Sequence, residues 1–282
     1  ARCCPFAAGP WWMLSDQHKL HIERIQATAA SGKLAVLYGA GVSMSSGLPS
    51  WGGLLGMMAE RAGFDPEECD DLAELDYLDQ PVLIAERMGG EAAFKKAVAS
   101  AVESARYTPG HAMLGALSGG LGVPAVTTNY DPLYEDAVTS TGARILRIPW
   151  DQEEAQNDET GMLPQLLKLH GCVTDPPSIV LSRADYMRYA DNKGALRGLL
   201  SQMLMQKRML VVGFSMRDEN VHKAIDEVRK CRTFHMDESQ KGGAPPRSSP
   251  AYAAGPSHPT AEHAACGLHQ SARTSGEGSI GM

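Results

Sequence analysis

Four short motifs bring together residue types that suit chemistry on a nucleotide. Glycine-rich turns present backbone N–H groups to phosphate oxygens. An Asn amide can hold a ribose hydroxyl, a carboxylate can accept from a carboxamide, and a His can act as a general base. Such a set suits a nucleotide whose glycosidic bond is to be broken. In order along the chain, the motifs are GAGVSMSSGLPSW (residues 39–51), TTNYD (127–131), KLHG (168–171) and VVGFS (211–215).

The first motif places Gly39, Ala40, Gly41 and Ser43 at a turn that follows an apolar run. The usual dinucleotide-binding fingerprint has a third Gly or Ala where this chain has Met44, so this is not the fingerprint of a standard dehydrogenase. A tight turn between a strand and a helix accounts for the glycines equally well. The motif alone therefore leaves both interpretations open.

The second motif places Asn129 and Asp131 just past a buried strand. Asn129 could hold a ribose hydroxyl or a water, because its amide both donates and accepts hydrogen bonds. Asp131 could accept from a carboxamide. The alternative for Asp131 is that it caps the helix that begins at Pro132, since Asp is a favoured N-cap residue.

The third and fourth motifs supply His170, Gly213 and Ser215. His170 could act as a general base near neutral pH, and the alternative is a histidine that is hydrogen-bonded in the core. Ser215 could bind phosphate or ribose, or cap the helix that follows. His111 and His222 lie in no supporting motif, so we interpret them as structural or solvent-exposed.

Alternating strands and helices must position these motifs. Short apolar runs predict strands at residues 34–39, 123–129, 143–150, 165–171, 178–182 and 208–215. Helical spacing of apolar residues lies between them, as in residues 91–105 and 195–206. This alternation predicts an α/β fold, a three-layer Rossmann-like parallel sheet with helices on both faces. Ligands bind such sheets at the carboxyl ends of the strands, where all four motifs stand.

The sequence divides into three parts. We expect an N-terminal appendage at residues 1–12, a domain at 13–238 with a helical insertion at about 60–106, and a disordered tail at 239–282. The tail has few apolar side chains, too few to offset the entropy of ordering it. A sheet of this kind usually gains another strand after the helix at 218–231, and none is visible in the sequence. We therefore hypothesise that the chain is a truncated or frame-shifted version of a longer protein.

Composition excludes several classes of protein. The chain has 282 residues, a hydrophobic fraction of 43% and a net charge of −7. No basic run indicates a nucleic-acid partner, and no apolar run reaches the roughly 18 residues of a membrane helix. The six cysteines form no C-x-x-C pair, which argues against a zinc ribbon and a disulfide framework. We therefore expect a cytoplasmic protein that binds neither nucleic acid nor a membrane.

Taken together, the four motifs resemble the sirtuin-type NAD-binding domain. The pattern of that family is GAG-x-S followed by SG-[IL]-P, then T-x-N-x-D, then a catalytic HG, then G-x-S. Residues 39–43, 46–49, 127–131, 170–171 and 213–215 match it, so the resemblance spans about residues 34–230. Four motifs in the same order are a far stronger signal than any one of them.

Two departures from the family pattern matter for function. Deacylases of the family carry a zinc ribbon of two Cys pairs after the His, whereas Cys172 is the only cysteine between His170 and Gly213. The segment SIVLSRADYMRY (residues 178–189) stands where deacylases have their acyl-lysine-binding segment. The chain therefore looks like the zinc-free sirtuin-like branch, whose members are typically NAD hydrolases, often bacterial and often tied to antiphage defence.

The resemblance implies a site that holds NAD as the substrate, with no zinc. Asn129 would position the ribose hydroxyls or the attacking water, and His170 would take a proton from a ribose hydroxyl or from that water. Asp131 would bind the nicotinamide carboxamide. Around the rest of NAD, the resemblance implies binding positions at Gly39, Ala40, Gly41, Ser43, Pro49, Gly213 and Ser215.

The implied activity is NAD hydrolysis to nicotinamide and ADP-ribose. An NAD-dependent protein deacylase is the first alternative, and a non-catalytic NAD or ADP-ribose sensor is the second. Besides NAD, the sequence leaves open a homo-oligomer or a regulatory protein as a partner.

Overall fold

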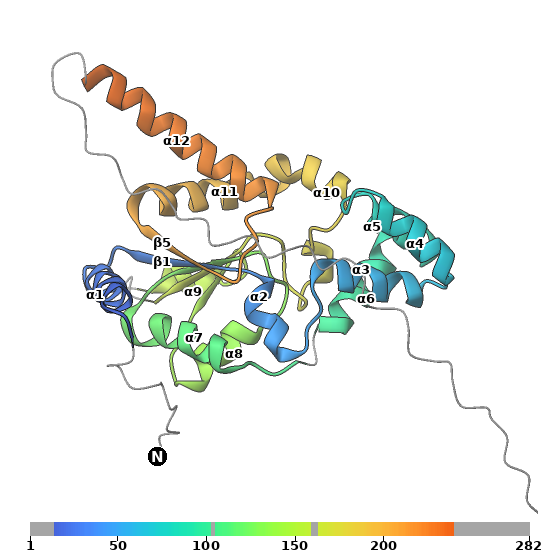
Figure 1. The fold of residues 1–282 in the computed structure, drawn as a ribbon, viewed down its shortest axis with the longest axis horizontal. Helices are drawn as coiled ribbons and strands as arrows, with labels where there is room; N and C mark the ends of the chain where they lie inside the picture. The colour runs from blue at the N-terminus through green and yellow to red at the C-terminus, as the bar shows by residue number, and fades with distance from the viewer. Residues whose placement is uncertain (1–13, 103–104, 159–162, 240–282) are drawn as a thin grey trace, which may run out of the picture. The chain divides into compact units, whose positions relative to one another are not determined.

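The computed structural model describes residues 14–102, 105–158 and 163–239. Its centre is one parallel sheet, which Figure 1 shows behind the labels β1 and β5. The strand order is β3-β4-β2-β1-β5. The strands are β1 (Leu34–Tyr38), β2 (Ala125–Thr127), β3 (Leu146–Ile148), β4 (Gln165–Lys168) and β5 (Arg208–Val212). Every residue of β1 is buried, which explains why this strand is a continuous apolar run rather than an alternating one.

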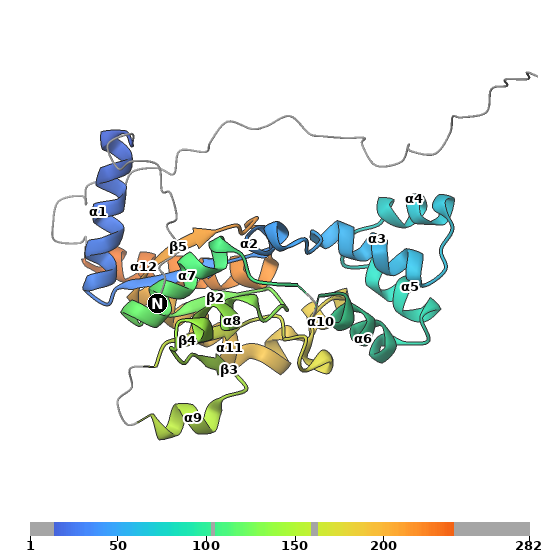
Figure 2. The ribbon, with the colours of Figure 1, turned by 90° about the horizontal axis from the view of Figure 1, so that it is seen from below.

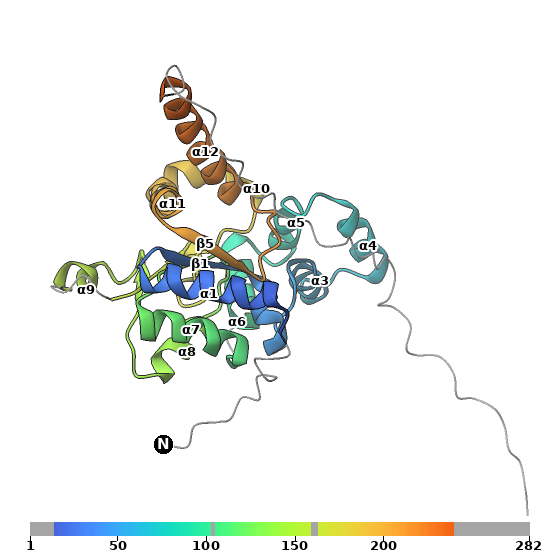
Figure 3. The same ribbon diagram turned by 60° about the vertical axis from the view of Figure 1, so that its left-hand side comes forward.

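Helices cover both faces of the sheet, as Figure 3 shows from the side. On one face, Val36 and Tyr38 pack against α1 (Asp16–Ala30), α7 (Pro109–Leu121) and α8 (Leu133–Ser140). On the other face, Leu37 packs against α11 (Tyr189–Gln206) and α12 (Glu219–Ser239). The predicted α/β fold, a Rossmann-like parallel sheet between layers of helices, is confirmed.

Two short elements and a group of helices follow β1. The chain passes through α2 (Ala40–Ser43) and the 3₁₀ turn η2 (Met44–Ser46) into the helices α3 (Trp51–Arg61), α4 (Pro66–Glu74), α5 (Gln80–Arg87) and α6 (Glu91–Val102). We call α3 to α6, residues 51–102, the helical module, and Figure 2 shows it beside the sheet. Side chains cap the first turns of two of its helices. The Ser50 hydroxyl caps α3, and Asp65 and Glu68 form a capping box at α4.

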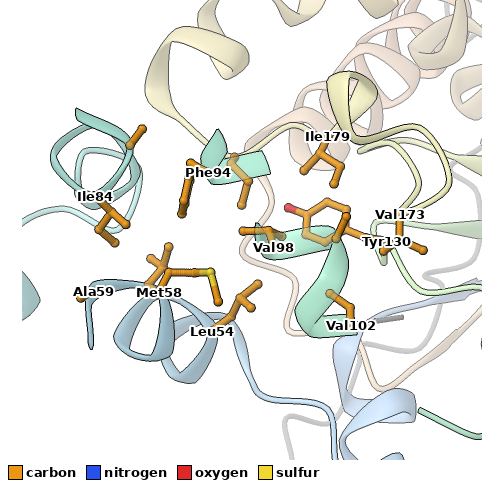
Figure 4. Packing of buried hydrophobic residues seen from close by; sticks show 14 of the residues in the cluster. Leu54, Met58, Ala59, Ile84, Phe94, Val98, Val102, Tyr130, Val173 and Ile179 are labelled. Atoms are coloured by element: carbon orange, nitrogen blue, oxygen red, sulfur yellow. The ribbon is translucent and has the colours of Figure 1, made fainter. Parts of the chain in front are cut away.

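The helical module has its own apolar core, which extends to the loops of the sheet. Leu54, Met58, Ile84, Phe94 and Val98 pack together in it (Figure 4). Five buried residues from the loops after β2 and β4 belong to the same cluster, namely Tyr130, Cys172, Val173, Ile179 and Leu181. Since Tyr130 lies between Asn129 and Asp131, the module packs directly against the second motif.

The strand predicted at residues 178–182 is absent from this structure. A 3₁₀ turn, η3 (Pro176–Ser178), precedes the segment, and residues 179–182 lie in no strand. Ile179 and Leu181 are apolar because they are buried against the helical module. A short apolar run cannot by itself distinguish strand pairing from this kind of burial, which is why the prediction was wrong.

The remaining elements are α9 (Gln152–Asn157) and α10 (Arg183–Met187). The predicted appendage at residues 1–12 and, beyond the last residue of α12, the predicted tail lie outside the described residues. Among the helices of the described segments, none is long and apolar enough to span a membrane.

Candidate active site

The first and fourth motifs meet backbone to backbone at the carboxyl ends of β1 and β5. The Gly41 N–H donates to the carbonyl oxygen of Gly213 across 2.9 Å, and the Gly39 N–H donates to that of Val212 across 3.2 Å. A Cβ atom on Gly41 would lie 2.8 Å from the same Gly213 oxygen, and Gly213 has a φ of +60°. Close packing therefore requires glycine at both positions, whatever ligand the turn binds.

The contact between these turns leaves exposed backbone beside the strand ends. Ala40, Gly41, Gly213 and Ser215 are exposed, whereas Gly39 is buried. Pro49 is half-buried in the loop before α3. Neither Pro49 nor Ser215 contributes a side chain to the hydrogen-bonded networks described next.

Ser43 is the centre of a buried network that joins the first two motifs. Its hydroxyl donates to Asp131 Oδ2 across 2.9 Å and accepts from Asn129 Nδ2 across 3.0 Å. Asn129 and Asp131 are 7% and 3% exposed. The Asp131 carboxylate also accepts from the Leu133 N–H at the start of α8. Ser43 thus fixes both polar side chains of the second motif, and Asp131 holds the start of α8 at the same time.

His111 completes this network from α7. Its Nδ1 accepts from the Thr108 N–H across 3.2 Å, so its proton lies on Nε2, which is 3.2 Å from the Ser43 hydroxyl. Burial lowers the pKa of His111, and the charge of Asp131 opposes this only in part. His111 is therefore neutral at physiological pH and donates to Ser43.

Asn129 and His170 follow neighbouring strands at the same level. Thr127 of β2 pairs in register with Lys168 of β4, and each candidate stands two positions after its strand residue. The Asn129 N–H donates to the Thr127 hydroxyl across 3.0 Å, which holds the turn. The sheet therefore delivers an amide and an imidazole to the same end of two adjacent strands.

Lys168 binds the backbone of the second motif through its buried ammonium group. It is fully buried, and its Nζ donates to the carbonyl oxygen of Asp131 and to Glu135 Oε1, each across 2.7 Å. Burial disfavours the charge of Lys168, but Glu135 outweighs it with other nearby charges, so the pKa of Lys168 is raised. Lys168 is thus a buried cation that ties the backbone at Asp131 to helix α8.

The loop that carries His170 is tied to the second motif by hydrogen bonds. The Val180 N–H donates to the carbonyl oxygen of His170 across 2.9 Å, and the Tyr130 hydroxyl donates to that of Val180 across 2.8 Å. Gly171 has a φ of +97°, and a Cβ atom there would collide with the carbonyl group of Ser178. Close packing against Ser178 therefore requires glycine at the position after His170.

His170 itself lies in a second polar cluster. Its Nε2 is 3.1 Å from Asp218 Oδ2, and the two side chains are 4% and 8% exposed. The rings of Tyr186 and Tyr189 approach the imidazole edge-on, with centroids 5.4 Å and 6.0 Å away. These aromatic rings flank the imidazole from α10 and α11.

Three buried residues of these networks were not singled out from the sequence. His111 was interpreted as structural or exposed, and Lys168 and Asp218 received no role. Lys168 is the first residue of the third motif, and Asp218 stands three positions after Ser215 of the fourth. Their position in or beside a motif is the signal in the sequence that points to them. Their burial and partners are visible only in the tertiary structure.

Within the described segments, no group of three or more His, Cys, Asp or Glu side chains is placed to hold a metal ion. The residues of the described part therefore do not fit the zinc site of the deacylases.

Comparisons with known proteins agree with the motifs. The family model described as "SIR2-like domain" matches residues 124–257. The chain is 28% identical over 222 residues to the NAD(+) hydrolase ThsA of Enterococcus faecium, covering 75% of this chain and 43% of that protein. It is 29% identical over 201 residues to the protein of the same name from Bacillus cereus, covering 70% and 40%.

A third relative is defense-associated sirtuin 2 of Bacillus subtilis, 27% identical over 222 residues, which covers 76% of this chain and 21% of that protein. The chain thus spans less than half the length of these curated relatives. The family match covers β2, β3, β4 and β5, and the relatives' matches cover most of this chain. The chain carries a sirtuin-like domain of the bacterial branch.

Proposed function

We propose that this domain hydrolyses NAD, cleaving the bond between nicotinamide and ribose to give nicotinamide and ADP-ribose. The observation that carries the proposal is the placement of Asn129 and His170 at the same end of two adjacent strands. The exposed glycine turns of β1 and β5 provide backbone for the pyrophosphate nearby. The names of the relatives support the same activity.

The chemistry needs a held ribose, a positioned water and a base. A water oxygen forms a bond to ribose C1′, and the bond from C1′ to the nicotinamide nitrogen breaks, with its electron pair leaving on nicotinamide. His170 takes the proton that the water loses, and Asn129 positions the ribose hydroxyls or that water. A positioned base contributes about 10²- to 10⁴-fold to such a rate.

The role of Ser43 follows from the buried network rather than from the resemblance. The Ser43 hydroxyl is committed to Asn129, Asp131 and His111, so we assign Ser43 to positioning these side chains instead of binding phosphate directly. Asp131 keeps its proposed contact with the nicotinamide carboxamide. The pyrophosphate and adenosine part of NAD is still proposed to bind at Gly39, Ala40, Gly41, Gly213 and Ser215. Pro49 lies in the loop beside these residues.

The two alternatives predict different products. A deacylase would release acetyl groups from acetyl-lysine in the presence of NAD, and the short interval between His170 and Gly213 disfavours it. A sensor would bind NAD without consuming it. The presence of both an Asn and a His at the strand ends favours an enzyme.

We propose a cytoplasmic setting and a role in antiphage defence. The sequence has no C-x-x-C pair, which suits a reducing compartment, and one relative is named a defense-associated sirtuin. NAD is the proposed partner, with a second copy or a regulatory protein as candidates for control of the activity. We propose that the domain binds neither nucleic acid nor a membrane.

The test is turnover by the purified protein. We expect NAD to yield equal amounts of nicotinamide and ADP-ribose, without zinc in the protein and without deacylation of an acetyl-lysine peptide. Asn129→Ala and His170→Ala should each reduce kcat by at least about 10²-fold. Nucleotide binding should weaken much less, because interactions made mainly in the transition state appear in kcat.

His21→Ala is the matched control for the imidazole. His21 is exposed on α1, before the amino end of β1, so its replacement should leave turnover unchanged. If the wild-type protein binds NAD and never consumes it, the protein is an NAD sensor and not an enzyme. If both site variants hydrolyse NAD at the wild-type rate, the residue assignment is wrong.

A further inference from the structure

A carboxylate outside the four motifs faces the proposed base. Asp218 immediately precedes α12, and its Oδ2 atom is 3.1 Å from His170 Nε2. Both side chains are almost completely buried. A charged group this close to a buried imidazole must affect the ring's orientation and its proton.

The second function of Asp218 is structural and uses its other oxygen. Oδ1 accepts from the Val221 N–H across 2.9 Å and so caps the start of α12. Oδ2 accepts from the Tyr186 hydroxyl across 2.7 Å and lies toward His170. The two oxygens therefore have separate tasks, and only Oδ2 lies toward the proposed site.

Asp218 is ionised whenever the enzyme is active. Burial raises its pKa, but the nearby charge of His170 and the hydrogen bonds from Tyr186 and Val221 outweigh burial and hold the pKa at about 2. The other ionisable groups whose electrostatics involve Asp218 are Tyr77, Tyr130, Tyr186 and Tyr189. Burial raises the pKa of each phenol, so the carboxylate is the charge that acts on His170 from this side.

An ionised carboxylate can only accept, so the nitrogen that faces it carries a proton. Nε2 is the nitrogen of His170 nearest to Asp218, which places the proton of the neutral ring on Nε2 and the lone pair on Nδ1. The angle of the contact is not yet that of a hydrogen bond in this structure. Catalytic hydrogen bonds are often poorly aligned before the substrate binds.

We propose that Asp218 is a positioning residue for His170: its carboxylate fixes the imidazole with the proton on Nε2 and leaves Nδ1 to accept the proton released during hydrolysis. This inference rests on the proposed NAD hydrolysis. When Nδ1 takes that proton, the ring becomes a cation, and the Asp218 carboxylate stabilises it. Tyr186 and Tyr189 hold the ring plane between them.

Asp218→Asn separates this role from capping. Asn is as good an N-cap as Asp, so α12 keeps its cap, while the charge opposite His170 is lost. We expect kcat for NAD to fall by at least about 10-fold with KM changed by less than about threefold, and a melting temperature that shows a folded protein. Asp218→Glu, which restores a carboxylate, should recover part of kcat.

Tyr186→Phe is the control for the rest of the cluster. It removes the other side-chain donor to Oδ2 and keeps the carboxylate and the ring, so its loss of kcat should be smaller than that of Asp218→Asn. A folded Asp218→Asn variant with wild-type or higher kcat would show that Asp218 only caps α12. That result would overturn the inference and leave the proposed function intact, provided that His170→Ala is inactive.

A second readout does not depend on turnover. In ¹⁵N spectra of imidazole-labelled protein, the signals lost in His170→Ala identify this ring. We expect the neutral His170 ring to carry its proton on Nε2 in wild type and to lose this single preference in Asp218→Asn. The same tautomer in both proteins would contradict the inference even if the protein hydrolysed no NAD.

Discussion

Lys168 and Asp131 are joined beneath the candidate site by a hydrogen bond of 2.7 Å from the buried ammonium group to the backbone carbonyl. The same Nζ is 2.7 Å from Glu135 Oε1. One buried cation thus connects β4, the strand before His170, to the turn that carries Asn129 and Asp131. The two strand ends that bear the proposed chemistry are therefore fixed relative to each other by a charge as well as by the sheet.

Lys168→Met should be strongly destabilising. It keeps the length of the side chain but leaves the Glu135 carboxylate buried without its cation, and breaking a buried ion pair in this way costs about 3–5 kcal/mol. Urea unfolding of wild type and variant measures the difference. The double variant Lys168→Met with Glu135→Leu removes the stranded charge, so it should recover part of the loss; a double variant less stable than Lys168→Met would contradict this explanation.

Ser43→Ala should disturb the site more than the fold. The substitution removes the common partner of Asn129, Asp131 and His111, and unsatisfied buried polar groups cost about 1–3 kcal/mol. We expect that loss in unfolding free energy and a fall in kcat for NAD hydrolysis of at least about 10-fold. Ser140→Ala is the control, because Ser140 is exposed at the end of α8 and its hydroxyl donates to the Ala137 carbonyl of the same helix, and it should alter neither quantity appreciably.

Gly41→Ala should weaken nucleotide binding through the backbone. The new Cβ atom would lie 2.8 Å from the Gly213 carbonyl oxygen, so the turns after β1 and β5 must move apart. We expect a lower melting temperature and at least a severalfold increase in the Kd for NAD, measured by calorimetry. Gly52→Ala, at a helical glycine with no atom within 4 Å of the new Cβ, should leave the Kd unchanged.

Acid should remove the contribution of Asp218 to stability. Its pKa is about 2 in the folded protein against an ordinary 3.8. A carboxyl whose pKa is depressed by folding stabilises the protein above its unfolded pKa, and this is lost as the pH falls through the folded pKa. The difference between these two pKa values corresponds to about 2 kcal/mol, most of which is lost by the time the pH reaches 2.

The difference in unfolding free energy between wild type and Asp218→Asn should therefore shrink by about that amount between pH 5 and pH 2. Chemical denaturation at several pH values measures it, because the other carboxyl groups titrate equally in both proteins. A difference that is constant over this range would show that Asp218 is not held ionised by its partners.

The helical periodicity and the apolar runs were enough to predict the α/β fold and several of its helices. The helices predicted at residues 91–105 and 195–206, for example, correspond to α6 (Glu91–Val102) and to most of α11 (Tyr189–Gln206). The prediction failed at residues 178–182, where Ile179 and Leu181 are apolar through burial against the helical module. Local spacing carries no information on which distant surface will cover a short apolar run.

The sequence by itself determined which chemical groups stand at the strand ends, because Asn129, His170 and the glycines occur in motifs of fixed order and spacing. Only the tertiary structure decided what holds them. Ser43 and His111 are 68 positions apart, and Ser43 and Asp131 are 88 apart, yet one buried network joins all three. Asp218 reaches His170 from the start of another helix. Such partners are set by how the strand ends and helices pack, since a buried polar group must find its hydrogen bonds in space wherever the chain supplies them.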